Sequence, residues 1–376
     1  MKMRIAIEAQ RIFRQKKHGM DFVVLETIRR LQAMDTDNEY FIMVAPGPDH
    51  CLEESPNVRI VEVKCPTYPL WEQAALPLAL KKIKPDILHC TSNTAPVFCN
   101  TPLILTLHDI IFLEKRSGQN KSAYQNAGRI YRRMVVPRIL PHCKRIITVS
   151  DFERERILSA LDIPAGRVTA IHNGFSSHFR KTGDTFSVTS KYLDEKEYIF
   201  FLGNTDPKKN TPRTLAAYAM YARAADTPKP LLVADLNRET IDTILEENGI
   251  QDIRPLLRLP GYIPNKDLPA VYSGASVFLY TSLRESFGIP ILEAMACGTP
   301  VVTSATSAIP EVAGKGAILV NPENAAEIAA RITELEENAA VRAQAVEYGL
   351  ERVKMFSWEK TAAALLDVYR QVYAGK

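Results

Sequence analysis

Two acidic residues, eight positions apart, are the most suggestive chemical groups in this sequence. Glu285 lies in a loop after an expected strand over residues 276–280, and Glu293 lies in the expected helix that follows. A carboxylate accepts two hydrogen bonds in a forked geometry, so each acid suits a pair of vicinal hydroxyls. Sugars and riboses present such pairs, whereas a phosphate would be repelled. The same spacing is also typical of a helix that carries acids near its N-terminus for electrostatic reasons alone.

The segment between these two acids predicts a binding site for an anion. Pro290 suits the first helical position, and Gly298 followed by Pro300 predicts the end of that helix. The loop at 286–288 therefore leads into a helix N-terminus, where backbone N–H groups point toward an anion such as a diphosphate. A diphosphate with one acid for a ribose and another for a hexose is what a nucleotide sugar needs.

Polar residues at the ends of other expected strands are further candidates. Lys208 and Lys209 follow an expected strand over residues 198–202, and a lysine there would neutralise a phosphate, although most loop lysines are simply solvated. His108 and Asp109 end an apolar strand of the first half. A polar pair in that position indicates either a satisfied core network or a ligand, and we favour the ligand.

Composition limits the classes of protein to consider. The chain has 376 residues, enough for two domains, and its 46% hydrophobic and 24% charged residues are typical of a soluble globular protein. A net charge of +4 is too small to imply nucleic acid. We find no apolar run long enough to span a bilayer, no signal-peptide pattern and no metal-like spacing among the six cysteines. These features predict a cytoplasmic protein with reduced thiols.

Strand and helix patterns alternate along the chain, which predicts parallel sheets covered on both faces. The expected strands of the first half are residues 4–7, 40–44, 86–89, 102–107, 145–149 and 168–172. After a polar stretch at 176–197, those of the second half are residues 198–202, 230–234, 256–259, 276–280 and 300–303. We therefore expect an α/β fold with two doubly wound, Rossmann-like domains, residues 1–180 and 181–356. Ligands of such sheets bind beyond the carboxyl ends of the strands, so a cleft between the domains is the expected site.

The segment from Gly261 to Thr303 resembles the donor-site region of family 4 retaining glycosyltransferases, the group 1 transferases of the GT-B fold. Glu285 and Glu293 match the Glu-x7-Glu motif of that family. The similarity continues through four further segments, at residues 107–109, 171–174, 203–210 and 307–312. The resemblance implies two Rossmann-like domains that face each other across a cleft, with a last helix at 357–376 that crosses back to the first domain.

The resemblance also implies a role for each matching residue. Glu293 would hold the ribose hydroxyls, and Glu285 would contact the donor hexose near the reacting carbon. Lys209 would neutralise the leaving phosphate, His108 would contact the donor sugar, and Asp109 is the candidate for a contact with the acceptor. The other donor-binding candidates are Phe287, Gly288 and Ile289 at the helix N-terminus, Asn204 and Lys208 after the first strand of the second domain, Gly19 in the N-terminal loop, and Arg258 and Tyr262 near the base.

Two departures from the family pattern concern the charge and shape of the donor site. Asn204 stands where many members carry an arginine, so one positive charge for the diphosphate is missing, and Lys208 would compensate. The N-terminal loop around Gly19 has fewer glycines than is usual in the family.

The implied reaction is a retaining, metal-independent transfer of a hexose from a nucleoside-diphosphate sugar to a saccharide or lipid-linked acceptor. It would serve cell-surface polysaccharide or lipopolysaccharide synthesis. Lys209 and the helix N-terminus would stabilise charge on the leaving phosphate, so we expect neither a metal nor another cofactor. No pair of carboxylates suits a glycosidase-like double displacement. The alternatives are a nucleotide-sugar epimerase and a non-catalytic sugar-nucleotide-binding protein on the same fold.

Residues 115–145 form a basic segment with nine lysines and arginines and no acid, interleaved with aromatic and aliphatic residues. Such a segment suits an anionic membrane surface or a lipid-diphosphate acceptor, and equally a plain basic surface helix. The first of these readings predicts a peripheral contact with the inner face of a membrane. No nucleic acid is expected as a partner, because the segment lacks any accompanying recognition motif.

Overall fold

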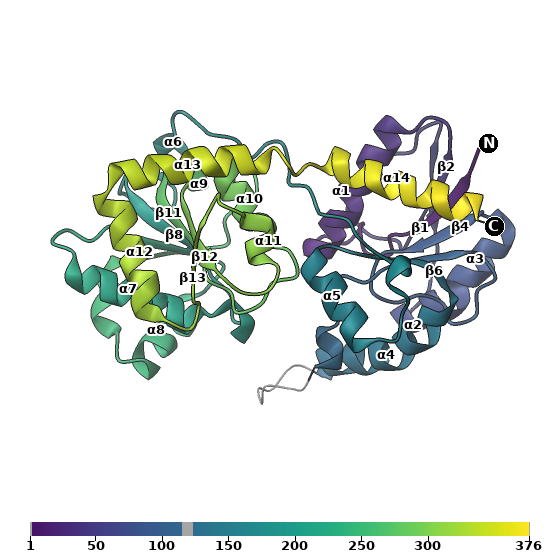
Figure 1. Cartoon of the computed structure of the whole chain (residues 1–376), viewed down its shortest axis with the longest axis horizontal. Helices are drawn as coiled ribbons and strands as arrows, with labels where there is room; N and C mark the ends of the chain where they lie inside the picture. The colour runs from purple at the N-terminus through teal and green to yellow at the C-terminus, as the bar shows by residue number, and fades with distance from the viewer. Residues whose placement is uncertain (1, 115–122, 376) are drawn as a thin grey trace. The chain divides into compact units, whose positions relative to one another are not determined.

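The computed structural model describes residues 2–114 and 123–375. Its internal contacts divide the chain into two compact units. The N-terminal unit comprises Met1–Gly174 and Trp358–Lys376, and the C-terminal unit comprises Phe175–Ser357. Each unit is a parallel sheet with helices between its strands, so the expected α/β fold with two Rossmann-like domains is confirmed (Figure 1).

The N-terminal unit has a seven-stranded parallel sheet in the order β3-β2-β1-β4-β5-β6-β7. The strands are β1 (Arg4–Glu8), β2 (Glu39–Val44), β3 (Val58–Glu62), β4 (Ile87–Cys90), β5 (Leu103–Thr106), β6 (Cys143–Thr148) and β7 (Val168–Ala170). The order reverses between β1 and β4, which are paired neighbours. The loops after β1, β4 and β5 therefore gather at one edge of the sheet, where ligands of doubly wound folds bind.

Helices cover the faces of this sheet, and the last helix of the chain is among them. They are α1 (Gly19–Met34), α2 (Tyr68–Leu70), η1 (Trp71–Ala75), α3 (Leu76–Ile83), η2 (Ile111–Leu113), α4 (Ala123–Ile139), η3 (Leu140–His142), α5 (Asp151–Ala160), η4 (Ala165–Arg167) and α14 (Trp358–Ala374). Helix α14 packs beside α1 (Figure 1). The Tyr369 hydroxyl on α14 lies 2.7 Å from Nδ1 of His89, and Thr361 donates to the carbonyl of His172 at 2.7 Å. These polar contacts fix α14 to β4 and to the segment that follows β7.

The C-terminal unit has a six-stranded parallel sheet in the order β10-β9-β8-β11-β12-β13. The strands are β8 (Tyr198–Leu202), β9 (Leu231–Ala234), β10 (Leu257–Gly261), β11 (Ala275–Tyr280), β12 (Val301–Ser304) and β13 (Ile318–Val320). The order reverses between β8 and β11. Near-continuous apolar sequences form the central strands because both faces of the sheet are covered.

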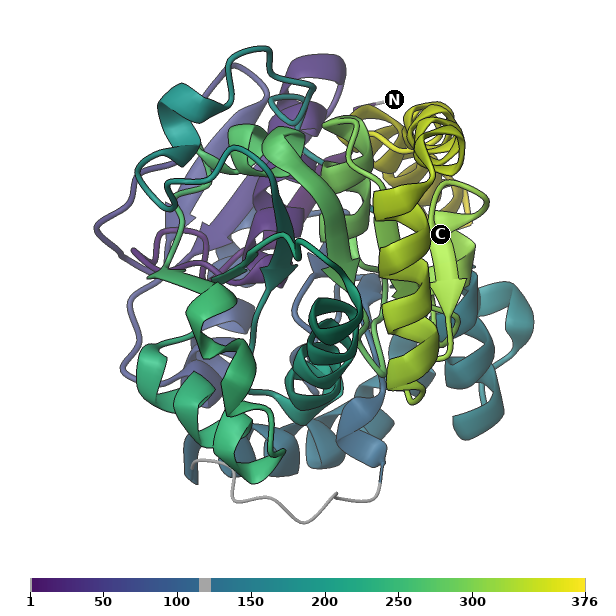
Figure 2. The ribbon, with the colours of Figure 1, turned by 90° about the vertical axis from the view of Figure 1, so that its left-hand side faces the viewer.

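The helices of the C-terminal unit follow the same alternation, and Figure 2 turns this unit toward the viewer. They are α6 (Phe186–Thr189), η5 (Pro207–Lys209), α7 (Thr211–Ala224), α8 (Arg238–Glu247), η6 (Gln251–Leu256), α9 (Leu268–Gly274), α10 (Ile289–Ala296), α11 (Ile309–Ala313), α12 (Ala325–Glu337) and α13 (Ala339–Val353). Helices α7 and α12 pack against each other over one face of the sheet. Among the described residues of the whole chain, no helix has the length and apolar character needed to cross a bilayer.

Candidate functional site

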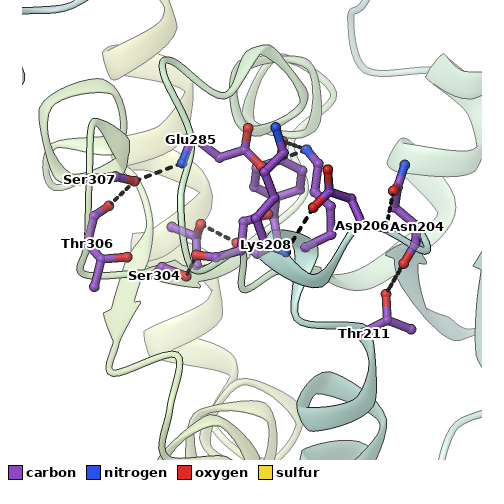
Figure 3. A network of polar contacts seen from close by, with 12 residues as sticks. Asn204, Asp206, Lys208, Thr211, Glu285, Ser304, Thr306 and Ser307 are labelled. Atoms are coloured by element: carbon purple, nitrogen blue, oxygen red, sulfur yellow. Dashed lines mark hydrogen bonds and ion pairs between the residues drawn. The ribbon is translucent and has the colours of Figure 1, made fainter. Parts of the chain in front are cut away.

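The loops after β8 and β11 meet at the point where the strand order of the C-terminal sheet reverses. The backbone N–H of Leu283 donates to the carbonyl of Lys208 at 2.7 Å, which ties the two loops together. The first loop carries the candidate lysines, and the second carries Glu285. The polar contacts around this junction are drawn in Figure 3.

Lys209 and Glu285 form a direct ion pair at this junction. Nζ of Lys209 lies 2.6 Å from Oε1 of Glu285 and donates to the Tyr280 hydroxyl at 3.0 Å. The side chain of Glu285 is 11% exposed and that of Lys209 is 22% exposed, so little water competes with the pair. Burial, reinforced by the Glu285 charge, raises the pKa of Tyr280 well above its usual value. Tyr280 is therefore a neutral hydrogen-bonding group that positions Lys209.

The backbone of Glu285 is fixed by the segment that follows β12. Its N–H donates to Oγ of Ser307 at 3.0 Å (Figure 3), and its carbonyl accepts from the N–H of Ala308 at 3.3 Å. Ser307 has a φ of +57°, a left-handed conformation that is uncommon outside glycine. The sequence singled out this segment only through the family resemblance, because a serine gives no sign that its φ is positive.

The turn that presents the two lysines is fixed by polar side chains. The carboxylate of Asp206 accepts from the N–H of Lys208 at 3.2 Å, and Asn210, with a φ of +60°, donates to the carbonyls of Thr281 at 3.0 Å and Pro322 at 2.7 Å. Asn210 was not among the predicted site residues, although asparagine next to a helix start is a signal for a left-handed turn.

Asn204 and Lys208 lie in the same loop as Lys209. Asn204 is exposed, and its carbonyl accepts from the Thr211 hydroxyl at 2.6 Å, which joins the loop to the start of α7 (Figure 3). Lys208 is half-buried. The loop thus presents one lysine in an ion pair and a second lysine beside it.

The N-terminus of α10 lies against the same tyrosine as Lys209. Gly288 precedes Ile289 at the start of the helix with a φ of +103°, a conformation that favours glycine. A Cβ atom at Gly288 would lie 3.8 Å from the ring of Tyr280. Phe287 is buried, and its ring packs edge-on against Phe356 at 5.9 Å. The positive end of the helix dipole and the Lys209 ammonium thus both lie beside Tyr280, and two positive groups at one place suit an anion.

Glu293 lies in the second turn of α10 and is half-buried. Burial raises its pKa to about 7, and the Tyr272 hydroxyl approaches its carboxyl at 3.4 Å. Among the described residues Glu293 has no ion-pair partner. A half-buried acid without a cation is costly to the fold, which is typical of a residue kept for a ligand.

Arg258 and Tyr262 lie apart from this group, on and after the edge strand β10. The guanidinium of Arg258 forms a two-point ion pair with Glu195. Tyr262 is 74% exposed. The C-terminal unit therefore brings together Lys209, Glu285 and the start of α10, but it does not join Arg258 to them.

His108 follows β5 in the N-terminal unit and is held by two contacts. Its backbone N–H donates to Oδ1 of Asn93 at 2.7 Å, and its Nε2 lies 3.0 Å from the carbonyl of Thr91. A carbonyl only accepts, so Nε2 carries the proton. Burial lowers the pKa of the imidazole, which is therefore neutral, with Nδ1 as a hydrogen-bond acceptor.

Asp109 and Gly19 are the other two candidates in the N-terminal unit. Asp109 is half-buried, and its Oδ1 accepts from the N–H of Ile111 at 3.0 Å, where η2 begins. Gly19 is the exposed first residue of α1, and a Cβ atom there would meet nothing within 4 Å. The fold itself therefore does not require glycine at position 19.

Two family models match this chain. The model described as "Glycosyl transferases group 1" matches residues 185–352, and the model described as "Glycosyltransferase Family 4" matches residues 18–178. The first lies within the C-terminal unit, and the second lies almost wholly within the N-terminal unit.

Two Escherichia coli proteins are among its relatives. The O-antigen chain mannosyltransferase B is 34% identical over 236 residues, which are 61% of this chain and 61% of that protein. The serotype-specific mannosyltransferase WbdA is 26% identical over 322 residues, which are 80% of this chain and 38% of that protein. The chain thus spans less than two thirds of either relative.

Solved structures share the fold over the whole chain. The sucrose-phosphate synthase of Thermosynechococcus elongatus matches with a TM-score of 0.77 and 21% identity over 100% of both chains. Anabaena Alr3699/HepE in complex with UDP-glucose matches with a TM-score of 0.73 and 17% identity over 98% of this chain and 100% of that one. The two family models together match residues 18–178 and 185–352, so the chain belongs to the group 1 glycosyltransferases, family 4, and the solved structures share its GT-B fold.

Proposed function

We propose that this chain transfers mannose from a nucleoside-diphosphate sugar to a saccharide or lipid-linked acceptor in the synthesis of a cell-surface polysaccharide. Family membership supports glycosyl transfer, and the names of the relatives support mannose and an O-antigen-like product. The observation that carries the proposal is the 2.6 Å contact between Lys209 and Glu285, beside the N-terminus of α10.

The chemistry of Lys209 fits a leaving diphosphate. An ammonium group has three N–H donors, and two of them are directed to Glu285 and Tyr280. The third remains for an oxygen of the diphosphate, so the donor need not displace either contact. Because the charge is in place before the bond breaks, it stabilises the leaving group without reorganisation.

We propose that the reaction retains the anomeric configuration and needs no metal ion. Lys209 and the helix N-terminus supply the positive charge that a divalent ion supplies in other transferases. Glu285, already paired with Lys209, would stabilise positive charge on the sugar ring rather than attack it. A phosphate oxygen of the leaving group would then take the proton of the acceptor hydroxyl on the same face, and Asp109 is our candidate for a contact with that acceptor.

Incubation of the purified chain with GDP-mannose, UDP-glucose and ADP-glucose tests the proposal. We expect a mannose nucleotide to raise the melting temperature, because ligand binding stabilises the folded state. With a mannoside acceptor, an α-linked product should form from the α-linked donor, and EDTA should not slow its formation. An isomerised nucleotide sugar in the absence of acceptor would instead identify an epimerase, and binding without turnover would identify a non-catalytic protein.

We also propose that helix α4 contacts an anionic membrane surface. Residues 115–122 of the basic segment lie outside the described residues, so the argument rests on α4 itself. Ile130 and Met134, one helical turn apart, are 58% and 49% exposed. Arg133 and Arg138 are exposed near them, which gives an apolar stripe with cations at its border.

We expect the protein to co-sediment with phosphatidylglycerol vesicles at low salt. Replacement of Ile130 and Met134 together by glutamate should lower the bound fraction at least about tenfold, because each apolar group buried contributes on the order of 2 kcal/mol. Met34→Glu is the matched control, since Met34 is also exposed but lies on α1. Equal binding by the double variant and the control would contradict a contact through α4.

A further inference from the structure

Arg11, in the loop after β1, has hydrogen-bond donors that the fold does not use. Its Nε and Nη2 are buried and make no hydrogen bond within the described part of the chain. Nε lies 2.9 Å from Oδ1 of Asp21, a charge contact whose geometry is not that of a hydrogen bond. The Arg11 side chain is 19% exposed and that of Asp21 only 2%. Buried donors are nearly always satisfied, so Nη2 of Arg11 is available to an acceptor from outside the fold.

Arg11 lies on the edge of the sheet that also carries His108. Strands β1, β4 and β5 are adjacent, so the loops that follow them share one edge. The electrostatics agree: burial is the main cause of the lowered pKa of His108, the Arg11 charge adds to the lowering, and the charge of Asp21 opposes it. The guanidinium, the carboxylate and the imidazole thus lie within electrostatic range of one another.

The charges around Arg11 favour a neutral ligand. Asp21 balances the guanidinium, and the buried side chain of Glu8, three residues earlier in the sequence, accepts from the backbone N–H groups of Gln10 at 3.0 Å and Thr91 at 3.2 Å. A guanidinium already paired with a carboxylate attracts a phosphate less than a free one does. A hydroxyl is the better match, because it accepts from Nη2 of Arg11 and can donate to Nδ1 of His108.

We infer that Arg11 and His108 together bind one hydroxyl of a neutral sugar, with Arg11 as the donor and His108 as the acceptor. The inference rests on the proposed function, in which that sugar is either the transferred hexose or the acceptor saccharide. Arg11 is thereby a substrate-binding residue that neither the motif nor the family resemblance indicated.

Arg11→Gln tests the assignment by steady-state kinetics with each substrate varied in turn. We expect the KM of one substrate to rise about 10- to 100-fold, the usual effect of losing a hydrogen bond to a charged group. A rise for the donor identifies the hydroxyl as that of the transferred hexose, and a rise for the acceptor assigns it to the acceptor. Arg14→Gln is the matched control, because Arg14 is an exposed arginine of the same loop.

Arg11→Lys separates binding from folding, since lysine keeps the charge beside Asp21 but lacks the planar fork of guanidinium. It should fold like the wild type and still raise the same KM. Unchanged KM values in the folded variants would overturn the inference and leave Arg11 a structural partner of Asp21.

Saturation-transfer NMR with methyl α-D-mannopyranoside provides a readout that does not depend on turnover. If the wild type transfers no sugar, the proposed function fails, yet a mannoside signal that is lost in Arg11→Gln and kept in Arg14→Gln would uphold the hydroxyl site. If the wild type lacks transfer activity, equal mannoside signals in Arg11→Gln and Arg14→Gln would overturn the hydroxyl site.

Discussion

Replacement of Lys209 by alanine is expected to lower kcat for sugar transfer by about 10²- to 10³-fold. The ammonium lies 2.6 Å from Glu285, in a site where both side chains are mostly buried and where its charge is little screened. Its attraction for the leaving phosphate grows as the glycosidic bond breaks, so the loss should fall mainly on kcat rather than on KM. Initial rates at saturating donor and acceptor measure the effect.

Lys208→Ala is the comparison that tests whether position or mere charge matters. Lys208 lies next in sequence, but no ion pair of its side chain with a described carboxylate is present, so its loss should lower kcat much less. Circular dichroism melts should show both variants folded. A kcat for Lys209→Ala within about threefold of the wild type, or equal losses in the two variants, would contradict a specific role for Lys209.

The central strands and the helix that starts at the site were predictable from sequence. Strand β11 is a run of apolar β-forming residues, and it spans Ala275–Tyr280, one residue longer than expected. Proline within the first turn and glycine after the last turn marked the limits of α10. These signals are local, so no knowledge of distant contacts was needed.

Two of the four edge strands, β3 and β13, were not predicted, because their local signals are weak, whereas the edge strands β7 and β10 were expected. Strand β13 has three residues, and β3, at the border of its sheet, has a single buried residue, Val58. Short strands of this kind are stabilised by pairing with a neighbour, β12 or β2, and that pairing is a tertiary property.

Most of the predicted site came from a motif, and its geometry came from contacts that no local pattern encodes. Lys209 and Glu285 are 76 residues apart and meet only because β8 and β11 are neighbours in the sheet. The pairing of Arg258 with Glu195, 63 residues away, is of the same kind. The unused donors of Arg11 are visible only once every neighbour is placed.

Glu293→Gln is expected to stabilise the free protein at pH 8 while it weakens donor binding. Burial raises the pKa of Glu293 from 4.5 to about 7, so the folded state favours the protonated acid. The contribution of Glu293 to the free energy of unfolding is fully present below pH 4.5, where the carboxyl is protonated in both the folded and the unfolded state. It is lost as the pH rises through about 7. Above pH 7 the wild type carries a charge that glutamine lacks. Denaturant unfolding should therefore show a gain of about 1 to 3 kcal/mol for the variant at pH 8 and almost none at about pH 4.

The charge of Glu293 that lowers the stability of the free protein should strengthen donor binding, so Glu293→Gln should bind the donor more weakly. In the proposed complex the ribose hydroxyls donate to the carboxylate, so the wild type must be ionised to bind well, and its affinity should fall as the pH drops below about 7. Glutamine has one acceptor oxygen in place of two and no charge, so the variant should bind at least about tenfold more weakly at pH 8 and with little dependence on pH. Calorimetric titration with the nucleotide sugar at pH 6 and pH 8 measures both effects, and Glu347→Gln, at an exposed position on α13, is the control. A variant that is more stable yet binds the donor like the wild type would show that Glu293 does not contact the ribose.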